Sequence, residues 1–225
     1  MRNRKEGILG LLIVIFCLVG YVVGCTHDDV ILASSGSDIT RGEQKLTLTN
    51  PKHTFDKAHS NVQWSTAYLG ATSLLTGRFD NFGVTSFDFD ESNAAGIKFE
   101  AWVWLNTVNT SEPGRDDGCL LTTFATANGK TDEPENKATL ISIPGSGRYS
   151  STDAGFLVDA DFTFLGITKE VTVKMYFAPK SDIGTAFMAG LNSEFEISKA
   201  DFLPNDTNIG DIVRIKINSL MRIKK

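Results

Sequence analysis

The sequence has few of the residues that bind metals or phosphate backbones. Of 225 residues, only three are histidine, and 22 are Lys or Arg against 27 Asp or Glu, which gives a formal net charge of -5. An acidic chain with scattered lysines lacks the basic stripe that nucleic acids require, so nucleic acid is excluded as a partner. His27, His53 and His59 share no metal-ligand spacing. A Gly-x-Ser-x-Gly nucleophile elbow is also missing.

Cysteine is equally scarce. The three cysteines are Cys17, Cys25 and Cys119. We expect Cys17 to be removed with the apolar N-terminal run and Cys25 to carry lipid, as argued below, so Cys119 has no partner for an intramolecular disulfide. Stability must therefore come from a hydrophobic core, which the length of the remaining chain allows.

The N-terminus has the pattern of a targeting segment. Arg2, Arg4 and Lys5 precede an uncharged apolar run from Ile8 to Val23. The run ends in Val-Val-Gly-Cys25, which resembles a bacterial lipoprotein signal, cleaved before a cysteine that then carries lipid. We expect a signal peptide at 1–24, lipidation at Cys25 and a flexible tether at 25–45. The alternative is an uncleaved signal anchor. Either way we expect a bacterial envelope protein held at a membrane, facing the periplasm or the cell surface.

From Leu46 onward, short runs of apolar and polar residues alternate. In DFTFLGITKEVTVKMYF (161–177), Phe162 and Phe164 form one apolar face, and Val171, Val173, Met175 and Phe177 form another. Similar runs predict strands near 62–68, 75–79, 87–89, 97–105, 140–143, 156–164, 187–197 and 212–223. A short helix is expected near 120–126, within the long loop that follows Arg115. Short linkers favour antiparallel neighbours, hence an all-β barrel or sandwich.

Several motifs occur in one order along the chain. They are Asp56-x-x-His59-Ser60, Gly77-Arg78-Phe79, Asn106 to Thr110 followed by Arg115-Asp116, ADFTFLGITKEV (160–171), FEISKADF (195–202) and IGDIVRIKI (209–217). Together they resemble the YceI-like family. The resemblance implies that 46–225 is an antiparallel, eight-stranded, lipocalin-like barrel in the cell envelope that binds long isoprenoid chains.

Small residues among the inward-facing positions, such as Gly77 and Ala101, leave room for a slender guest. We predict that Phe162, Phe164, Val173 and Met175 face the lumen. The full set of predicted ligand contacts is Trp64, Tyr68, Phe79, Phe99, Val103, Phe162, Phe164, Val173, Met175, Phe187, Leu191 and Phe195, with His59 as a candidate for the head group. His59 could instead hydrogen bond to nearby backbone, and Arg115 and Asp116 could ring the mouth or lie in a solvated loop.

The leading hypothesis is a membrane-anchored carrier for a long-chain apolar lipid: a polyisoprenoid, a quinone-like molecule or a fatty-acyl amphiphile. It has no catalytic residues and no cofactor other than the bound lipid, and a homodimer is left open. The alternative is a non-catalytic interaction module whose barrel is filled by its own side chains. An enzyme would require convergent polar groups in the lumen, such as His59 beside an acid. A packed interior favours the module, and a continuous apolar tunnel favours the carrier.

Overall fold

The computed structural model describes residues 44–70, 73–117, 136–152 and 155–225. The expected signal peptide, Cys25, most of the tether, the helix near 120–126 and Cys119 lie outside these residues. Residues 39–225 form a compact unit of their own. The description below concerns that unit alone.

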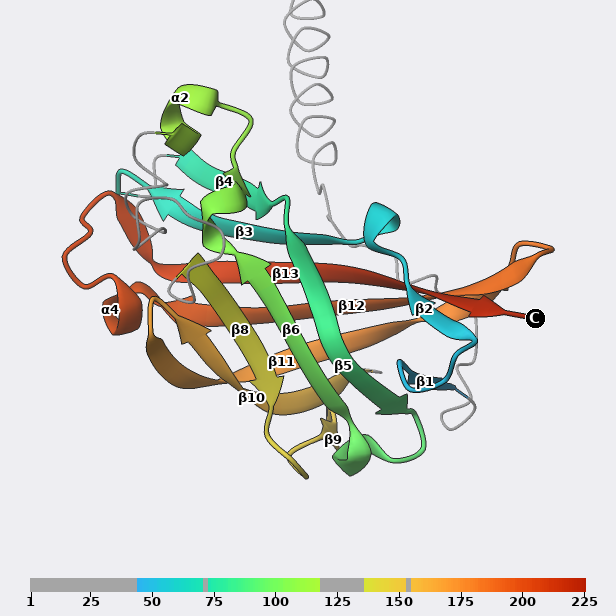
Figure 1. Cartoon of the computed structure of the whole chain (residues 1–225). Coiled ribbons are helices and arrows are strands. Elements are labelled where there is room, and N and C mark those ends of the chain that lie inside the picture. The colour runs from blue at the N-terminus through green and yellow to red at the C-terminus, as the bar shows by residue number, and fades with distance from the viewer. Residues whose placement is uncertain (1–43, 71–72, 118–135, 153–154) are drawn as a thin grey trace, which may run out of the picture. The chain divides into compact units, whose positions relative to one another are not determined.

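All described strands belong to one antiparallel sheet of 13 strands (Figure 1). They are β1 (Lys45–Thr47), β2 (His53–Phe55), β3 (Asn61–Tyr68), β4 (Ser73–Phe79), β5 (Phe82–Asp90), β6 (Lys98–Trp104), β7 (Val108–Asn109), β8 (Lys137–Ser142), β9 (Arg148–Tyr149), β10 (Phe156–Phe164), β11 (Ile167–Asp182), β12 (Ala186–Ser198) and β13 (Ile209–Lys224). Their order across the sheet is β1-β5-β6-β8-β10-β11-β12-β13-β3-β4-β7, with β2 beside β13 and β9 beside β10. The sheet curls strongly, so that its inner face surrounds a core.

Short helices connect the strands. They are η1 (Lys57–His59), η2 (Ala94–Gly96), η3 (Leu105–Thr107), α2 (Pro113–Arg115) and α4 (Lys199–Phe202). Within the described residues, no helix has the length and apolarity to cross a bilayer.

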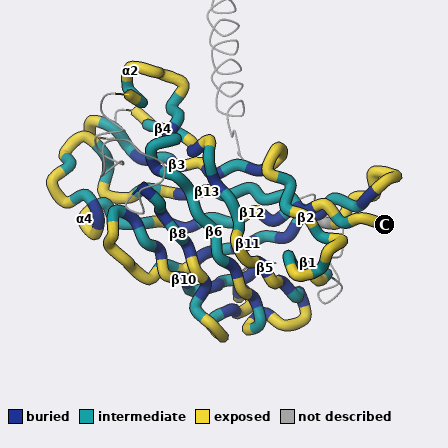
Figure 2. Tube along the Cα trace, in the orientation of Figure 1, coloured by how far each residue is buried: buried dark blue, intermediate teal, exposed yellow. Residues whose placement is uncertain are grey.

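Strand alternation determines which side chains enter the core. Along β10, Phe156, Val158, Ala160, Phe162 and Phe164 are all buried, whereas the residues between them are half-buried or exposed. The β10–β11 ladder runs from Phe156 opposite Met175 to Phe164 opposite Ile167. Leu165 and Gly166 close this hairpin with φ of 51° and 74°, a two-residue turn whose twist suits a hairpin. Figure 2 shows buried and half-buried stretches along the strands and exposed stretches mostly at the loops.

The all-β, antiparallel prediction is confirmed, and strands lie near every predicted position. The predicted number of eight was wrong: among the described residues there are nine longer strands, and four further strands, β1, β2, β7 and β9, are pairings of only two or three residues. The sheet is also not a barrel closed by a continuous ladder. Among the described pairings none joins β4 to β5, although only Asp80 and Asn81 separate them. The backbone there pairs with the η3 segment instead: Asp80 N donates to Thr107 O and Trp104 N donates to Asn81 O.

Candidate functional site

The curled sheet encloses a mostly apolar cavity of about 490 Å³. This volume lies within the range of small-ligand sites in proteins. Strands β3 to β6, β8 and β10 to β13 contribute side chains to its wall, as do Phe202 of α4 and Leu203 directly after it. Because hydrophobic side chains from almost every long strand converge on one space, the cavity suits an apolar guest.

One end of the cavity is closed by aromatic packing. On β5, Phe87 lines the cavity and Phe89 lies beyond it; on β11, Met175 lines it and Phe177 lies beyond it. The ring of Phe89 stacks on Phe177 at 5.4 Å between centroids and meets Phe156 edge-on at 5.1 Å. Phe89 is fully buried. These three rings pack together inside the sheet beyond this end of the cavity, and we call them the aromatic plug.

The opposite end is open, and we call it the mouth. Tyr68, Ser73 and Leu74 of the β3–β4 hairpin line the cavity there, together with Phe202 and Ile209. Leu74 lines the cavity and is also 70% exposed, so the lumen reaches the surface at this hairpin. As far as the described residues show, the cavity is thus a blind apolar channel with one entrance.

Polar groups also line the cavity. They include Arg115, Lys199, Asp206 and Asn208. The Lys199 ammonium donates to the backbone oxygens of Asp206 at 2.7 Å and Ile209 at 3.4 Å. An Asp211 carboxylate oxygen lies 3.6 Å from it. Lys199 therefore ties α4 to the start of β13 and shapes the mouth.

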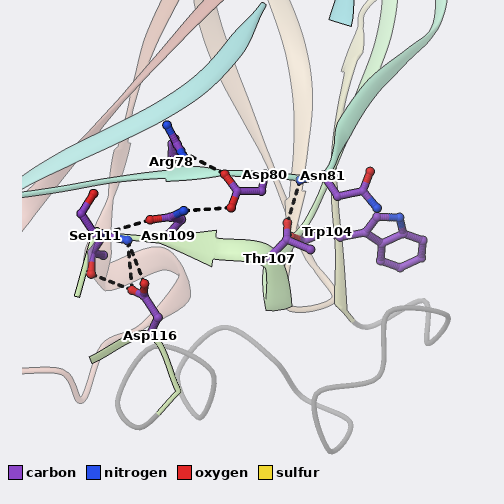
Figure 3. Close-up of polar contacts among 9 residues, drawn as sticks. Arg78, Asp80, Asn81, Trp104, Thr107, Asn109, Ser111 and Asp116 are labelled. Carbon is purple, nitrogen blue, oxygen red and sulfur yellow. Dashed lines mark hydrogen bonds and ion pairs between the residues drawn. The ribbon is translucent and has the colours of Figure 1, made fainter. Parts of the chain in front are cut away.

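A polar network connects Asp116, which directly follows α2, with residues next to β4 and β7 (Figure 3). The carboxylate of Asp116 accepts from the backbone N–H of Thr110 at 3.0 Å and from its hydroxyl at 2.6 Å. Asp80 accepts from Arg78 at 3.0 Å and from Asn109 at 2.9 Å. These bonds link β4, β7 and α2, and they place the half-buried Arg115 in the cavity wall.

Two tryptophan–glycine pairs shape the wall. Trp64 of β3 lies opposite Gly77 of β4, and a Cβ on Gly77 would lie 2.5 Å from Cζ2 of Trp64. Trp102 of β6 lies opposite Gly83 of β5, where a Cβ would lie 2.7 Å from Cζ2 of Trp102. In both pairs the indole covers the glycine backbone, which lets a large ring lie flat along the sheet. Lys137 stands 5.1 Å from the ring centroid of Trp102.

Most of the predicted ligand contacts lie in the cavity wall. Those that line it are Trp64, Tyr68, Phe79, Phe99, Val103, Phe162, Phe164, Val173, Met175, Leu191 and Phe195. The structure thus brings together, on one surface, predicted side chains from six strands. Whether they touch a lipid stays a prediction.

Two predicted contacts do not line the cavity. Phe187 lies on β12 near its hairpin with β11, where the ammonium groups of Lys180 and Lys225 stand 4.5 and 5.0 Å from its ring centroid. His59 lies on η1 with its side chain 71% exposed, and its Nδ1 lies 2.9 Å from an Asp56 carboxylate oxygen. This contact is the largest cause that lowers the pKa of Asp56. Neither position favours contact with a guest in the lumen.

Three wall residues were missed, because Val213, Ile215 and Ile217 line the cavity from β13. Arg115 of α2, which the sequence allowed either at the mouth or in a solvated loop, also lines the cavity. The β13 residues alternate in the sequence as clearly as those of β11, so alternation alone could have found them. The sequence could not decide between these two places for Arg115, because its position depends on the network around Asp116.

The carboxylates with lowered pKa values lie outside the cavity wall. They are Asp56, Asp90, Asp159 and Asp182, whose pKa values are lowered chiefly by hydrogen bonds from His59, Lys45, Arg148 and Lys225 respectively. In each case a hydrogen-bond partner at the protein surface explains the lowered pKa. In the part of the chain that the structure describes, no three His, Cys, Asp or Glu side chains group as metal ligands would.

The model of the YceI-like domain matches residues 53–220. The chain belongs to the YceI-like family. The match begins at β2 and ends within β13, so it includes every long strand that surrounds the cavity. No curated protein matches the chain.

Solved structures show the same fold as this YceI-like domain. BcnA from Burkholderia cenocepacia is 17% identical, with a TM-score of 0.57 over 74% of this chain and 99% of its own. A protein from Saccharophagus degradans, described as a polyisoprenoid binding domain implicated in plant cell wall breakdown, is 20% identical, with a TM-score of 0.52 over 76% and 98%. The Campylobacter jejuni YceI protein is 18% identical, with a TM-score of 0.54 over 68% and 87%.

Proposed function

We propose that this YceI-like domain is a non-catalytic binding and carrier protein for a lipid with a long apolar chain. The single observation that carries the proposal is the blind apolar channel of about 490 Å³, which is open only at the mouth within the described residues. The Saccharophagus degradans relative, described as polyisoprenoid binding, supports a polyisoprenoid as the first candidate. A quinone-like or fatty-acyl amphiphile has the same apolar character. An interaction module with a filled interior fits such a channel less well.

The energetics favour exchange over storage. Moving one isoprene unit from water into an apolar site gains on the order of 3–4 kcal/mol from its carbons. A lipid already in a bilayer has this gain, so a cavity of similar apolarity binds it at little net change in free energy. A guest can then leave as readily as it enters, which suits a carrier.

We further propose that the domain works at a membrane of the bacterial envelope. The support is the N-terminal sequence alone, in which a basic start and an apolar run precede Gly24-Cys25. Lipidation of Cys25 with several acyl chains would anchor the protein stably. Mass spectrometry of protein purified from its host would report both the acyl groups and any retained guest.

The binding proposal is tested by filling the cavity. Ala101 lines the cavity on β6, and Ala101→Trp places an indole in the lumen. We expect the variant to fold and to bind a fluorescent polyprenyl or fatty-acyl probe at least tenfold more weakly. Ala95→Trp is the matched control, because Ala95 is exposed on η2 and does not line the cavity. Wild-type protein that binds neither probe and retains no extractable lipid would overturn the proposed function.

A further inference from the structure

Large apolar side chains are exposed around the mouth. Leu69 is 55% exposed and Leu74 is 70% exposed, on either side of the turn of the β3–β4 hairpin. Ile167 (39%) follows the β10–β11 turn opposite the cavity residue Phe164, and Ile212 (48%) pairs with Ser198, which precedes α4. We call these four residues the mouth rim. The elements that carry them lie at one end of the sheet (Figure 1).

The backbone at Leu69 is unfavourable for its side chain. Leu69 has φ of 47° and precedes Gly70 at 72°. Asparagine and glycine adopt this left-handed region readily, whereas a leucine there is strained. Leu165 has a similar φ of 51°, but its side chain packs against the core. Leu69 is more than half exposed, so burial within the described fold does not account for a leucine at this position.

The mouth rim is continuous with the cavity. Leu74 belongs both to the wall and to the surface, and Tyr68, next to Leu69, also lines the cavity. Charges near the rim pair with each other: Lys169 lies 3.0 Å from Asp201 of α4, and Lys199 lies 3.6 Å from Asp211. A partner that covers the rim therefore meets apolar side chains and paired charges. Its own contacting region must be apolar rather than charged.

We propose that the mouth rim inserts into the surface of a zwitterionic lipid bilayer, so that the channel opens directly onto the lipid phase. A guest then passes from bilayer to cavity without crossing water. The role in loading rests on the proposed function, but the contact with the bilayer does not. Exposed apolar patches commonly mark such membrane contacts.

The contact is tested with residues 39–225 and phosphatidylcholine vesicles. Residues 39–225 form a compact unit that contains the whole described core, so we expect this fragment to fold without the N-terminal segment. We expect Leu69→Asn combined with Leu74→Ser to lower the vesicle partition coefficient roughly tenfold or more, because two leucines no longer enter the bilayer. Ile183→Ser is the matched control: Ile183 is 51% exposed near the β11–β12 turn, and its loss should change partitioning less than twofold.

Leu69→Asn also separates a membrane role from a structural one. Asparagine suits the left-handed backbone, so the variant should unfold at or above the temperature of the wild type while binding vesicles less. Equal vesicle binding by wild type and double variant, or an equal loss in Ile183→Ser, would overturn the proposal. Wild-type protein that takes up lipid from detergent but ignores vesicles would also overturn it, and would leave the proposed function standing. Vesicle binding without lipid uptake would support the contact and count against the carrier.

Discussion

The pair Trp64 and Gly77 shows how a single hydrogen in place of a side chain sets the width of the channel. The indole occupies the space where a Cβ at position 77 would lie, 2.5 Å from Cζ2. Gly77→Ala must therefore push Trp64 toward the lumen. We expect it to destabilise the fold by about 1–3 kcal/mol, as overpacking does, and to weaken binding of an apolar probe.

Denaturant unfolding and a probe titration measure both effects. Gly114→Ala is the control, because a Cβ at that exposed position meets Glu112 at an ordinary 3.4 Å. If Gly77→Ala leaves stability and probe binding at wild-type values, the indole does not depend on the glycine. The sequence alone indicated that Gly77 and Trp64 face inward. It could not show their contact, because that depends on the register of β3 against β4.

At the scale of elements, Asp159 of β10 connects β9 and β11 through side-chain hydrogen bonds on the outer face of the sheet. Its carboxylate accepts from Arg148 at 2.8 and 3.1 Å and from the Thr172 hydroxyl of β11 at 2.7 Å. The Arg148 hydrogen bonds, followed by the one from Thr172, lower the pKa of Asp159. A carboxylate with a lowered folded-state pKa stabilises the fold above the unfolded value of about 3.9, and this contribution is lost as the pH falls through the folded-state pKa.

We therefore expect Asp159→Asn to lower the free energy of unfolding at pH 7 by about 1 kcal/mol or less, because Arg148 is 46% exposed and solvent screens the pair. The difference from wild type should persist down to about pH 5 and shrink toward zero near pH 2. Urea unfolding across this range measures it. Asp161→Asn, at an exposed position of the same strand, is the matched control and should change the free energy of unfolding at pH 7 by less than Asp159→Asn does. A difference that grows on acidification would contradict the assignment.

The strands also show what the alternation of apolar and polar residues can predict and what it cannot. A period of two along β10 and β11 identified Phe162, Phe164, Val173 and Met175 as inward, and all four line the cavity. It also selected Phe187, which has the same pattern but lies on the part of β12 beyond the cavity. Alternation gives the face of a strand and not the position along it. Arg115 depends on hydrogen bonds from distant elements, which no local pattern contains.

At the scale of the whole molecule, the channel has a direction, with the mouth at one end and the aromatic plug at the other. The family motifs indicated a hollow β fold, but they did not indicate which end is closed. That depends on where Phe89, Phe156 and Phe177 meet across three strands. Because the plug ends the lumen, it should limit the length of chain that the cavity accepts.

Phe89→Ala tests this limit. Phe89 is fully buried against Phe156 and Phe177, so its loss should destabilise the fold by about 3–5 kcal/mol. Phe89→Leu is the milder variant if the alanine form does not fold. In either variant, the space left by the ring extends the lumen toward Phe177, and the best-bound member of a series of polyprenols or fatty acids should become longer. Phe187→Ala removes a phenylalanine outside the cavity and should leave the preferred length unchanged. An unchanged preference in folded Phe89 variants would mean that the chain does not reach the plug, and that guests are held nearer the mouth.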